Sequence, residues 1–398
     1  MSGPDRFVDR FSPSRRVRRG ATLTLVFASV LATGAATGSW SDAADAGRKP
    51  SPPSVRSDAA GPPKGDAGTA REAADAAAEA MADGKSGKEA AEDAVSRSGD
   101  RWGSVYSQGE FKEFEQALDG AYTGVGLWTR RAADGRIEVA RVQRGGPAAR
   151  AGVREGDRLR SVDGERVTGR PVTEVVALLR GERAGTPVVL GMERGTRAWS
   201  RTLHRARLST DSVTVGRLPD GAAVIKVDAF TKGSGEAVRS AIRDAPKGTG
   251  LLLDLRGNSG GLVSEAVTAA SALVDGGLVA TYDVRGEQKA LHAERGGDTS
   301  RPVVVLVDGG TMSAAELLTG ALQDRGRAVV VGSKTFGKGS VQMPSRLPDG
   351  SVAELTVGHY RTPSGRAVDG RGITPDLEVE DGAEGQAETV LTGLGPPS

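Results

Sequence analysis

The chain has 398 residues, enough for two domains and an N-terminal extension. Its formal net charge of +2 gives no broad positive field of the kind that binds nucleic acid, so we expect no nucleic-acid partner. With no cysteine, the chain has no disulfides, thiolate catalysis or cysteine-ligated zinc, and its three dispersed histidines do not form a zinc motif. We therefore predict neither a metal nor a cofactor.

Residues 1–41 have the layout of an export signal. Four arginines between positions 15 and 19 precede a mainly apolar stretch over residues 21–32, and small residues follow it. This order predicts a signal peptide, although the uncharged span of about twenty residues is also long enough for a membrane anchor. Cleavage is favoured and retention stays open. In both cases the rest of the chain lies outside the cytoplasm, secreted or anchored to the cell membrane.

The next two segments connect this signal to the folded part of the chain. Residues 42–68 contain five prolines and predict a disordered linker. Residues 69–100 are rich in alanine and acidic residues, and they predict two short helices interrupted near Gly84 and Gly87.

Residues 121–205 carry the elements of a ligand-binding module in order. Residues 122–127 (YTGVGL) resemble the carboxylate-binding loop of a PDZ domain, whose amides hold a peptide's terminal carboxylate while the peptide adds to the sheet edge. A strand over 137–142, glycine-rich turns over 145–164 and a helix over 172–180 follow. The expected peptide-binding residues are Gly124, Val125, Gly126 and Leu127 in the loop, and Val172, Val175, Val176 and Leu179 on the helix.

From residue 222 onward, predicted strands and helices alternate, which is an α/β pattern. Residues 251–261 (LLLDLRGNSGG) predict a buried strand that ends in a glycine-rich turn. Residues 303–307 (VVVLV) predict another strand, buried on both faces, followed by a turn and a helix over 312–324. An antiparallel section over 340–361 completes the pattern.

Ser313 lies at the first turn of the helix that follows the strand over 303–307. Free backbone N–H groups and the positive end of the helix dipole lie there and can stabilise an oxyanion. The glycine-rich turn at 257–261 offers a second set of exposed amides. The position of Ser313 also suits a helix N-cap, which is the commoner role of a serine before a helix.

Lys338 follows Ser313 by twenty-five positions and lies between two glycines. A lysine whose pKa is lowered by burial can take the proton of a serine hydroxyl, so the pair allows acyl-transfer chemistry without histidine. Gln342, four residues further on, can hold the lysine by a hydrogen bond.

Together, residues 251–261, 308–316 and 334–342 resemble the signature of the C-terminal processing peptidases, also called tail-specific proteases. The resemblance runs from about residue 70 to 380. It implies Ser313 as nucleophile, Lys338 as general base and Gln342 as the residue that orients the lysine. The implied oxyanion donors are the amides of Gly261 and Ala314. Met312 and Ala315 depart from the family pattern, but neither change removes a catalytic group.

The resemblance also implies a domain plan and a fold class. The fold is α/β, with a ClpP/crotonase-like layered catalytic core and an inserted PDZ domain, a small β-barrel with helices. Residues 101–120 would start the catalytic domain, 121–205 form the PDZ domain, 206–380 complete the catalytic domain and 381–398 form a flexible tail. In this family the helical region over 69–100 packs on the core and can pair subunits, which allows a homo-oligomer. A weakly ordered helical lead-in is the open alternative.

The function that follows is an exported serine endopeptidase. It would capture protein or peptide substrates by their free, apolar C-termini and hydrolyse them at the serine–lysine centre. The alternative is a secreted PDZ binding protein on an inactive hydrolase-like scaffold, although such a scaffold has no reason to keep Ser313, Lys338 and Gln342 together. A Ser-His-Asp esterase is a third option, and it would need His292 or His359 beside the serine.

Overall fold

The computed structural model describes residues 67–132, 134–284 and 287–395. The predicted signal peptide or anchor, and all but two residues of the predicted linker, lie outside these ranges. Within them, no helix combines the length and apolar character needed to cross a membrane.

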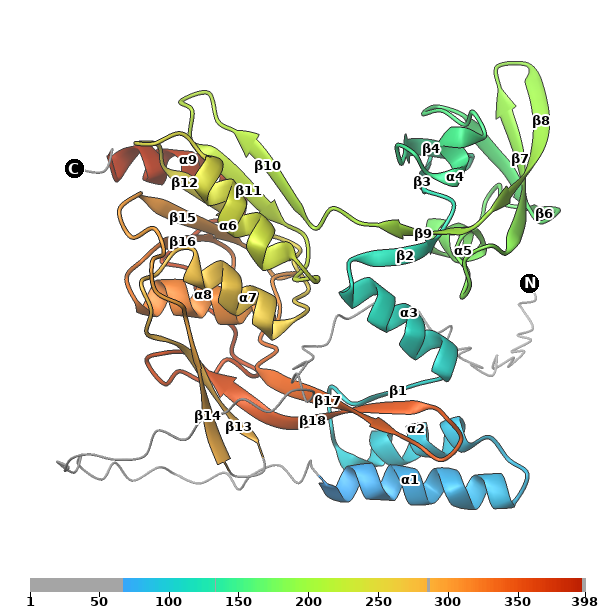
Figure 1. Cartoon of the computed structure of the whole chain (residues 1–398), viewed down its shortest axis with the longest axis horizontal. Helices are drawn as coiled ribbons and strands as arrows, with labels where there is room; N and C mark the ends of the chain where they lie inside the picture. The colour runs from blue at the N-terminus through green and yellow to red at the C-terminus, as the bar shows by residue number, and fades with distance from the viewer. Residues whose placement is uncertain (1–66, 133, 285–286, 396–398) are drawn as a thin grey trace, which may run out of the picture.

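A six-stranded sheet forms the centre of the C-terminal half of the described chain (Figure 1). Its first strand is antiparallel to the second, and all other neighbours are parallel. The strands in order are β10 (Val213–Arg217), β11 (Ala223–Val227), β12 (Leu251–Asp254), β15 (Val303–Val307), β16 (Val329–Gly332) and β19 (Leu377–Glu378). The predicted α/β pattern is confirmed.

Helices cover both faces of this sheet. The side chains of β15 alternate between the two faces, and all five residues of the strand are buried, as predicted. On one face lie α6 (Ser234–Asp244), α7 (Val263–Ser271) and α8 (Ala314–Asp324). On the other face lies α9 (Ala383–Gly393), whose Ala387 and Leu391 pack against β12 and β15.

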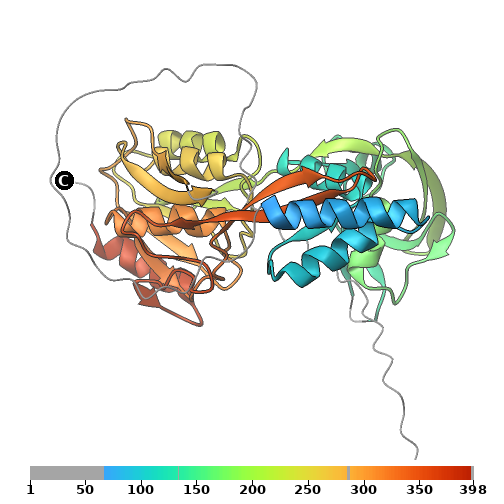
Figure 2. The ribbon, with the colours of Figure 1, turned by 90° about the horizontal axis from the view of Figure 1, so that it is seen from below.

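A second, antiparallel sheet connects the core to the N-terminal helices. It consists of β1 (Ser104–Tyr106), β18 (Val352–Arg361), β13 (Leu278–Val284) and β14 (Glu287–His292), with β17 (Ser340–Arg346) paired to β18. The hairpin of β17 and β18 extends beyond the core to α1 (Ala67–Ala82) and α2 (Gly87–Ser98), as Figures 1 and 2 show. Alanines of both helices pack against Ala353 and Leu355 of β18. The two predicted helices are therefore confirmed, and they are packed on the sheet and are not a weakly ordered lead-in.

The PDZ-like module is inserted between α3 (Gln108–Leu118) and β10. A two-stranded ribbon, β2 (Ala121–Gly124) and β9 (Ala206–Ser209), carries the chain into the module and out of it. The sheet of the module contains β3 (Leu127–Arg131), β4 (Ile137–Val142), β5 (Arg158–Val162), β7 (Pro187–Arg194) and β8 (Arg197–His204), with β6 (Glu165–Arg166) paired to β5. Two helices, α4 (Pro147–Arg150) and α5 (Val172–Leu179), complete it. Figure 1 shows the module standing apart from the six-stranded sheet.

The prediction of a flexible tail over residues 381–398 was wrong for most of that segment. Residues 383–393 form α9, and Leu391 is only 4% exposed. Gly250 leaves the space that Leu391 fills, since a Cβ on Gly250 would lie 2.7 Å from Leu391 Cδ1. This helix was not predicted because its apolar residues form only a weak periodic pattern, and only Ala387 and Leu391 are fully buried.

We expect Leu391→Ala to lower the free energy of unfolding by about 2–5 kcal/mol, because it removes a buried side chain and leaves a cavity. Leu394→Ala is the matched control, since Leu394 is 47% exposed and its loss should change stability by no more than about 0.5 kcal/mol. Urea denaturation of the full chain measures both effects. Equal midpoints for the two variants would show that α9 does not stabilise the sheet.

Candidate active site

The turn that carries Ser313 is joined to the glycine-rich turn of the neighbouring strand. The hydroxyl of Thr311 donates to the carbonyl oxygen of Leu255 at 2.9 Å, and the amide of Met312 donates to that of Asn258 at 2.8 Å. Because β12 and β15 are parallel neighbours, both turns lie at the carboxyl edge of the sheet, where α/β proteins place their sites.

Ser313 has a strained backbone and an unpartnered hydroxyl. Its φ of 56° and ψ of −115° lie outside the regions that a non-glycine residue favours, at a cost of about 1–3 kcal/mol. The residue is fully buried, and Oγ has no hydrogen-bond partner. The amide of Glu316 is placed as in a capping box, but it makes no hydrogen bond to Oγ of Ser313. The hydroxyl is therefore not used as a helix cap.

The carboxylate of Glu316 joins the serine turn to the lysine loop. Its Oε2 accepts from the amides of Ser313 and Lys338, each at 2.8 Å. Its Oε1 accepts from the amide of Gly337 at 2.7 Å and from the hydroxyl of Thr335. Burial raises the pKa of Glu316, while these four donors favour its charged form and oppose the rise. One buried side chain thus fixes the two chain segments that carry the predicted nucleophile and base.

Tyr360 provides a second link between the same two segments. Its hydroxyl lies 2.8 Å from the carbonyl oxygen of Ser313 and 3.1 Å from that of Lys338, and it donates to both. The ring is buried, and burial raises the pKa of the hydroxyl well above its usual value. Tyr360 therefore keeps its proton and stays a donor.

The side chain of Lys338 is almost completely buried. Only 1% of the residue is exposed, and its Nζ lies 5.4 Å from the centre of the Trp102 ring. Burial lowers the pKa of Lys338 to about 8, and the negative charges of Glu354, Asp100 and Asp369 oppose this shift. At pH 7 about a tenth of the amine is therefore neutral, against well under about a thousandth for a lysine with the usual pKa of 10.5.

The structure does not place Gln342 on the lysine. Its Nε2 donates to the carbonyl oxygen of Trp102, and its Oε1 is buried without a partner. No hydrogen bond joins Ser313 Oγ to Lys338 Nζ in the described part of the chain either. The segments of the three predicted residues meet, but the side-chain hydrogen bonds expected between them are not made in this conformation.

The predicted oxyanion donors lie beside Ser313. A Cβ added to Gly260 would come within 2.9 Å of Ser313 Cβ and 3.2 Å of the nitrogen of Ala314, so only glycine allows this approach. Gly261 has a φ of 128° and packs against the carbonyl of Phe230. Within the described residues, neither the amide of Gly261 nor that of Ala314 donates to a protein acceptor. Both amides are therefore free to bind an oxyanion.

Comparison with known proteins shows the family of the chain. The chain matches the models of peptidase family S41 over residues 221–379 and of the PDZ domain over residues 138–194. It is 31% identical over 286 residues to the carboxy-terminal processing protease CtpA of Bacillus subtilis, covering 71% of this chain and 61% of that protein. The chain belongs to peptidase family S41. The predicted resemblance is confirmed, while the exact domain boundaries stay a prediction.

Two further relatives carry the same kind of name. The chain is 36% identical over 282 residues to the chloroplastic C-terminal processing peptidase of Tetradesmus obliquus, covering 66% of this chain and 61% of that protein. It therefore spans 61% of the length of each of these curated relatives. Among solved structures, the photosystem II D1 C-terminal processing protease matches with a TM-score of 0.47 and 28% identity, covering 74% of this chain and 82% of that chain.

The PDZ loop fits its predicted role, but half of the predicted groove helix residues do not. The amides of Val125 and Gly126 lie outside the strands and donate to no backbone acceptor in the described chain. Val175 and Leu179, however, are 0% and 3% exposed and belong to the core of the PDZ domain. They anchor α5 to that core and do not line an open groove. Val172 and Val176 are half-buried and remain accessible.

A cavity of about 1300 Å³ lies between the PDZ domain and the lysine. Its walls come from α2, β1, α3, the ribbon of β2 and β9, and the PDZ domain, and Lys338 is one of its lining residues. Ser313 is not among them and has no exposed surface. A substrate carbonyl can therefore reach Oγ only after a movement of the groups that cover it.

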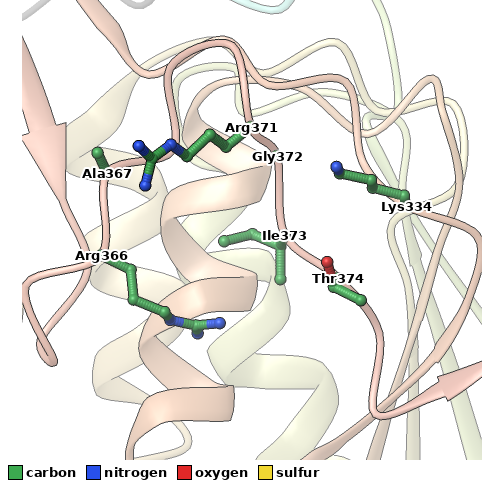
Figure 3. A pocket seen from close by; sticks show the side chains of 7 residues that line it. All are labelled: Lys334, Arg366, Ala367, Arg371, Gly372, Ile373 and Thr374. Atoms are coloured by element: carbon green, nitrogen blue, oxygen red, sulfur yellow. The ribbon is translucent and has the colours of Figure 1, made fainter.

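A second, smaller cavity lies beside Lys334, at the start of the loop that carries Lys338. It has a volume of about 360 Å³ and is lined by Lys334, Arg366, Ala367, Arg371, Gly372, Ile373 and Thr374 (Figure 3). Arg366 is paired with Asp324. The two cavities share no lining residue, so this basic hollow is not part of the serine–lysine site. The described part of the chain holds no group of three or more side chains suited to a metal ion.

Sequence analysis missed several residues of this S41 site. Glu316 follows Ser313 by three positions, which is the capping-box spacing, and that signal could have drawn attention to it. Trp102, Glu354 and Tyr360 come from distant parts of the sequence and carry no local motif. Their roles become visible only when the strands pair.

We expect Glu316→Gln to destabilise the fold and to loosen the lysine loop. Glutamine replaces one acceptor oxygen by an NH₂ group that faces N–H donors, and each buried group left without a partner costs about 1–3 kcal/mol. Urea denaturation and amide exchange of residues 334–339 measure the two effects. Glu115→Gln, at an exposed glutamate of α3, is the control and should change neither. Unaltered exchange in the loop of Glu316→Gln would contradict the role of this carboxylate.

Proposed function

We propose that this S41 protein is a serine endopeptidase with Ser313 as nucleophile and Lys338 as general base. The observation that carries the proposal is that an unpartnered, strained serine and a buried lysine are both held, through their backbone amides, by the carboxylate of Glu316. A structural serine or lysine gains nothing from this arrangement, whereas acyl transfer requires it. The names of the curated relatives, which are processing proteases, support the same reaction class.

In the proposed reaction, Oγ of Ser313 attacks the carbonyl carbon of the scissile peptide bond while Nζ of Lys338 takes the hydroxyl proton. The carbonyl oxygen becomes an oxyanion, which the amides of Gly261 and Ala314 stabilise. The tetrahedral intermediate then expels the amine, which receives the proton from the lysine ammonium. A water molecule, deprotonated by the same lysine, hydrolyses the acyl-enzyme and restores the serine.

The finer features of the function rest on the sequence. We propose that the PDZ domain captures substrates by a free, apolar C-terminus and that the N-terminal segment exports the protein, as a secreted or membrane-anchored enzyme. The unengaged amides of Val125 and Gly126, and the accessible Val172 and Val176, support C-terminal capture. Pairing of subunits through the helical region of residues 69–100 is a further proposal from the family resemblance.

One observation favours the alternative of a PDZ binding protein on an inactive scaffold. The hydrogen bond between Ser313 and Lys338 is absent, and the serine is covered. Apo sites often hold catalytic groups in longer contacts that tighten only with substrate, so we prefer the peptidase. Direct measurement of hydrolysis separates the two.

Ser313→Ala and Lys338→Ala should each reduce hydrolysis of an unfolded test protein by at least about a thousandfold. The double variant should be no worse than either single one, because the two residues act as a unit. Gln342→Ala should cost less, since it transfers no proton. Lys334→Ala, at an exposed lysine in the same loop, is the control and should retain activity.

The same assay should show a rate that rises with pH through about 8. The base must be neutral, and burial places the pKa of Lys338 at about 8, below its usual 10.5, so protonation removes activity as pH falls through that value. Full activity in Lys338→Ala would leave the protein without its proposed base and favour the binding-protein alternative.

Substrates with a free C-terminus should be cleaved faster than otherwise identical amidated ones. The loop amides would hold the carboxylate through charge-assisted hydrogen bonds, so amidation should lower kcat/KM by about tenfold or more. The difference should shrink in Val176→Asp, which places a like charge beside the carboxylate. Val215→Asp, at an exposed valine of β10, is the matched control. Equal rates for the two substrates at subsaturating concentration would refute C-terminal capture but not the peptidase.

A further inference from the structure

Glu354 is a buried carboxylate without a hydrogen-bond partner. The residue is 0% exposed, and neither Oε1 nor Oε2 accepts a hydrogen bond. Such a group is costly, because an ionised carboxylate loses its hydration without compensation. Native proteins pair nearly all buried polar groups, so an exception of this kind points to a role other than stability.

The position of Glu354 directs it toward the active site. On β18, it pairs with Ser104 of β1 on one side and with Pro344 of β17 on the other. Its neighbours in sequence, Ala353 and Leu355, pack against α1 and α2 on one face of the sheet. Because side chains alternate along a strand, Glu354 lies on the opposite face together with Val352, which packs against α3, and Thr356, whose hydroxyl donates to Asp100. Asp100 is one of the carboxylates that act on Lys338, so this face is directed toward the lysine.

Lys338 is the principal charged neighbour of Glu354. Their side chains make no ion pair in the described part of the chain, so the two charges interact through the protein interior without direct contact. This separation leaves the ammonium free to exchange its proton with a serine. At the same time, the interior screens the interaction less than water does.

The other charged and titratable groups around the pair come from separate elements. Asp100, before β1, and Asp369, in the loop after β18, also face Lys338. Within the described residues, the hydroxyl of Tyr106 of β1 is the one donor that approaches Glu354, but it does not complete a hydrogen bond to either oxygen. Burial and the nearby carboxylate raise the pKa of Tyr106 to about 12, so it stays neutral. Asp100 and Asp369 are each held by hydrogen bonds from neighbouring groups. Glu354 differs from them, because its charge has no such partner.

The pKa directions agree with this geometry. Burial raises the pKa of Glu354 to about 7, and the charge of Lys338 opposes the rise. Of the carboxylates that oppose the lowering of the pKa of Lys338, Glu354 has the largest effect. Two coupled groups of this kind titrate as a pair within the range in which the enzyme would work.

We propose that Glu354 acts through Lys338, as the counter-charge that stabilises the ammonium formed when the lysine takes the proton of Ser313. This role rests on the proposed peptidase function. In the step, the O–H bond of the serine breaks, an N–H bond forms on the lysine, and the positive charge appears in a buried place. A nearby fixed anion lowers the energy of that charged state. Glu354 is thus a positioning residue for the base, because it touches neither the substrate nor the reacting atoms.

The deciding experiment is the pH–rate profile of Glu354→Gln, which keeps the shape of the side chain and removes the charge. Without the anion, Lys338 loses its proton more readily, so the rising limb near pH 8 should move to lower pH by about 0.5–1 unit. The plateau rate should fall, because the lysine becomes a weaker base. Glu354→Asp keeps the charge and should restore most of the wild-type profile. Glu115→Gln controls for loss of a carboxylate elsewhere.

A second measurement does not depend on turnover. In protein carrying Ser313→Ala, the ¹³C shift of Lys338 Cε, assigned by its loss in Lys338→Met, reports the titration of the amine. Glu354→Gln should move that midpoint to lower pH by the same amount. Since this change removes a buried charge, the variant should fold, and Glu354→Leu serves the same test if it does not.

Profiles and titrations that coincide with those of the unaltered chain, in folded protein, would overturn the role of Glu354. Failure of the proposed function would look different, because hydrolysis would then persist in Ser313→Ala or be absent from the unaltered chain.

Discussion

The arrangement of the site depends on one buried carboxylate that receives four hydrogen bonds. Glu316 lies on the first turn of α8, so its position is fixed by the same helix that begins at Ser313. Its second function is to receive the amides of Gly337 and Lys338 from a loop more than twenty residues away. If this acceptor were lost, the serine turn and the lysine loop would be joined only by Tyr360 and by the hydrogen bond from the amide of Phe336 to the carbonyl oxygen of Thr311, among the contacts of the described chain. The relative position of Ser313 and Lys338 is therefore set largely by a side chain that is neither the proposed nucleophile nor the proposed base.

The six-stranded sheet supplies the rigid frame for this anchor. Its parallel strands β12 and β15 are buried on both faces, and their following turns are tied to each other by backbone and hydroxyl contacts. The second sheet brings Lys338 and Glu354 from the other side, on the loop before β17 and on β18. The site thus lies where two sheets with separate cores meet. Strain at Ser313 and unpartnered groups at Ser313, Gln342 and Glu354 gather at this junction, as expected for a place shaped by chemistry more than by stability.

Much of this fold could be predicted from the sequence, because its core strands are short, continuous apolar runs. The strand at residues 303–307 and the helix behind it were correct nearly to the residue. The packing of α9 was missed, since two buried residues in a helix rich in glycine and glutamate give a weak periodic signal. In the PDZ domain, a hydrophobic face was recognised correctly, but sequence could not separate Val175 and Leu179, which enter the core, from Val172 and Val176, which do not.

The residues of the site also divide into those that local sequence marks and those that only long-range packing places. Ser313 and Lys338 lie in glycine-rich turns after predicted strands, so local sequence marks them. Gln342 was marked by its spacing, yet its amide donates to the carbonyl of Trp102, which is 240 positions away in the sequence. Glu354 could not be recognised, because a glutamate in a strand ordinarily faces solvent. Long-range pairing determines which polar residues of a strand become buried, and a single sequence does not contain that information.

The two-stranded ribbon of β2 and β9 has a mechanical consequence. Both covalent connections of the PDZ domain pass through it side by side, held together by a ladder of hydrogen bonds from Ala121 to Gly124. Paired strands resist sliding past each other, so the domain can tilt or twist on this ribbon but cannot translate freely. The ribbon is also a wall of the large cavity that reaches Lys338. The orientation of the PDZ domain on this ribbon is therefore coupled to the shape of the cavity that Lys338 lines.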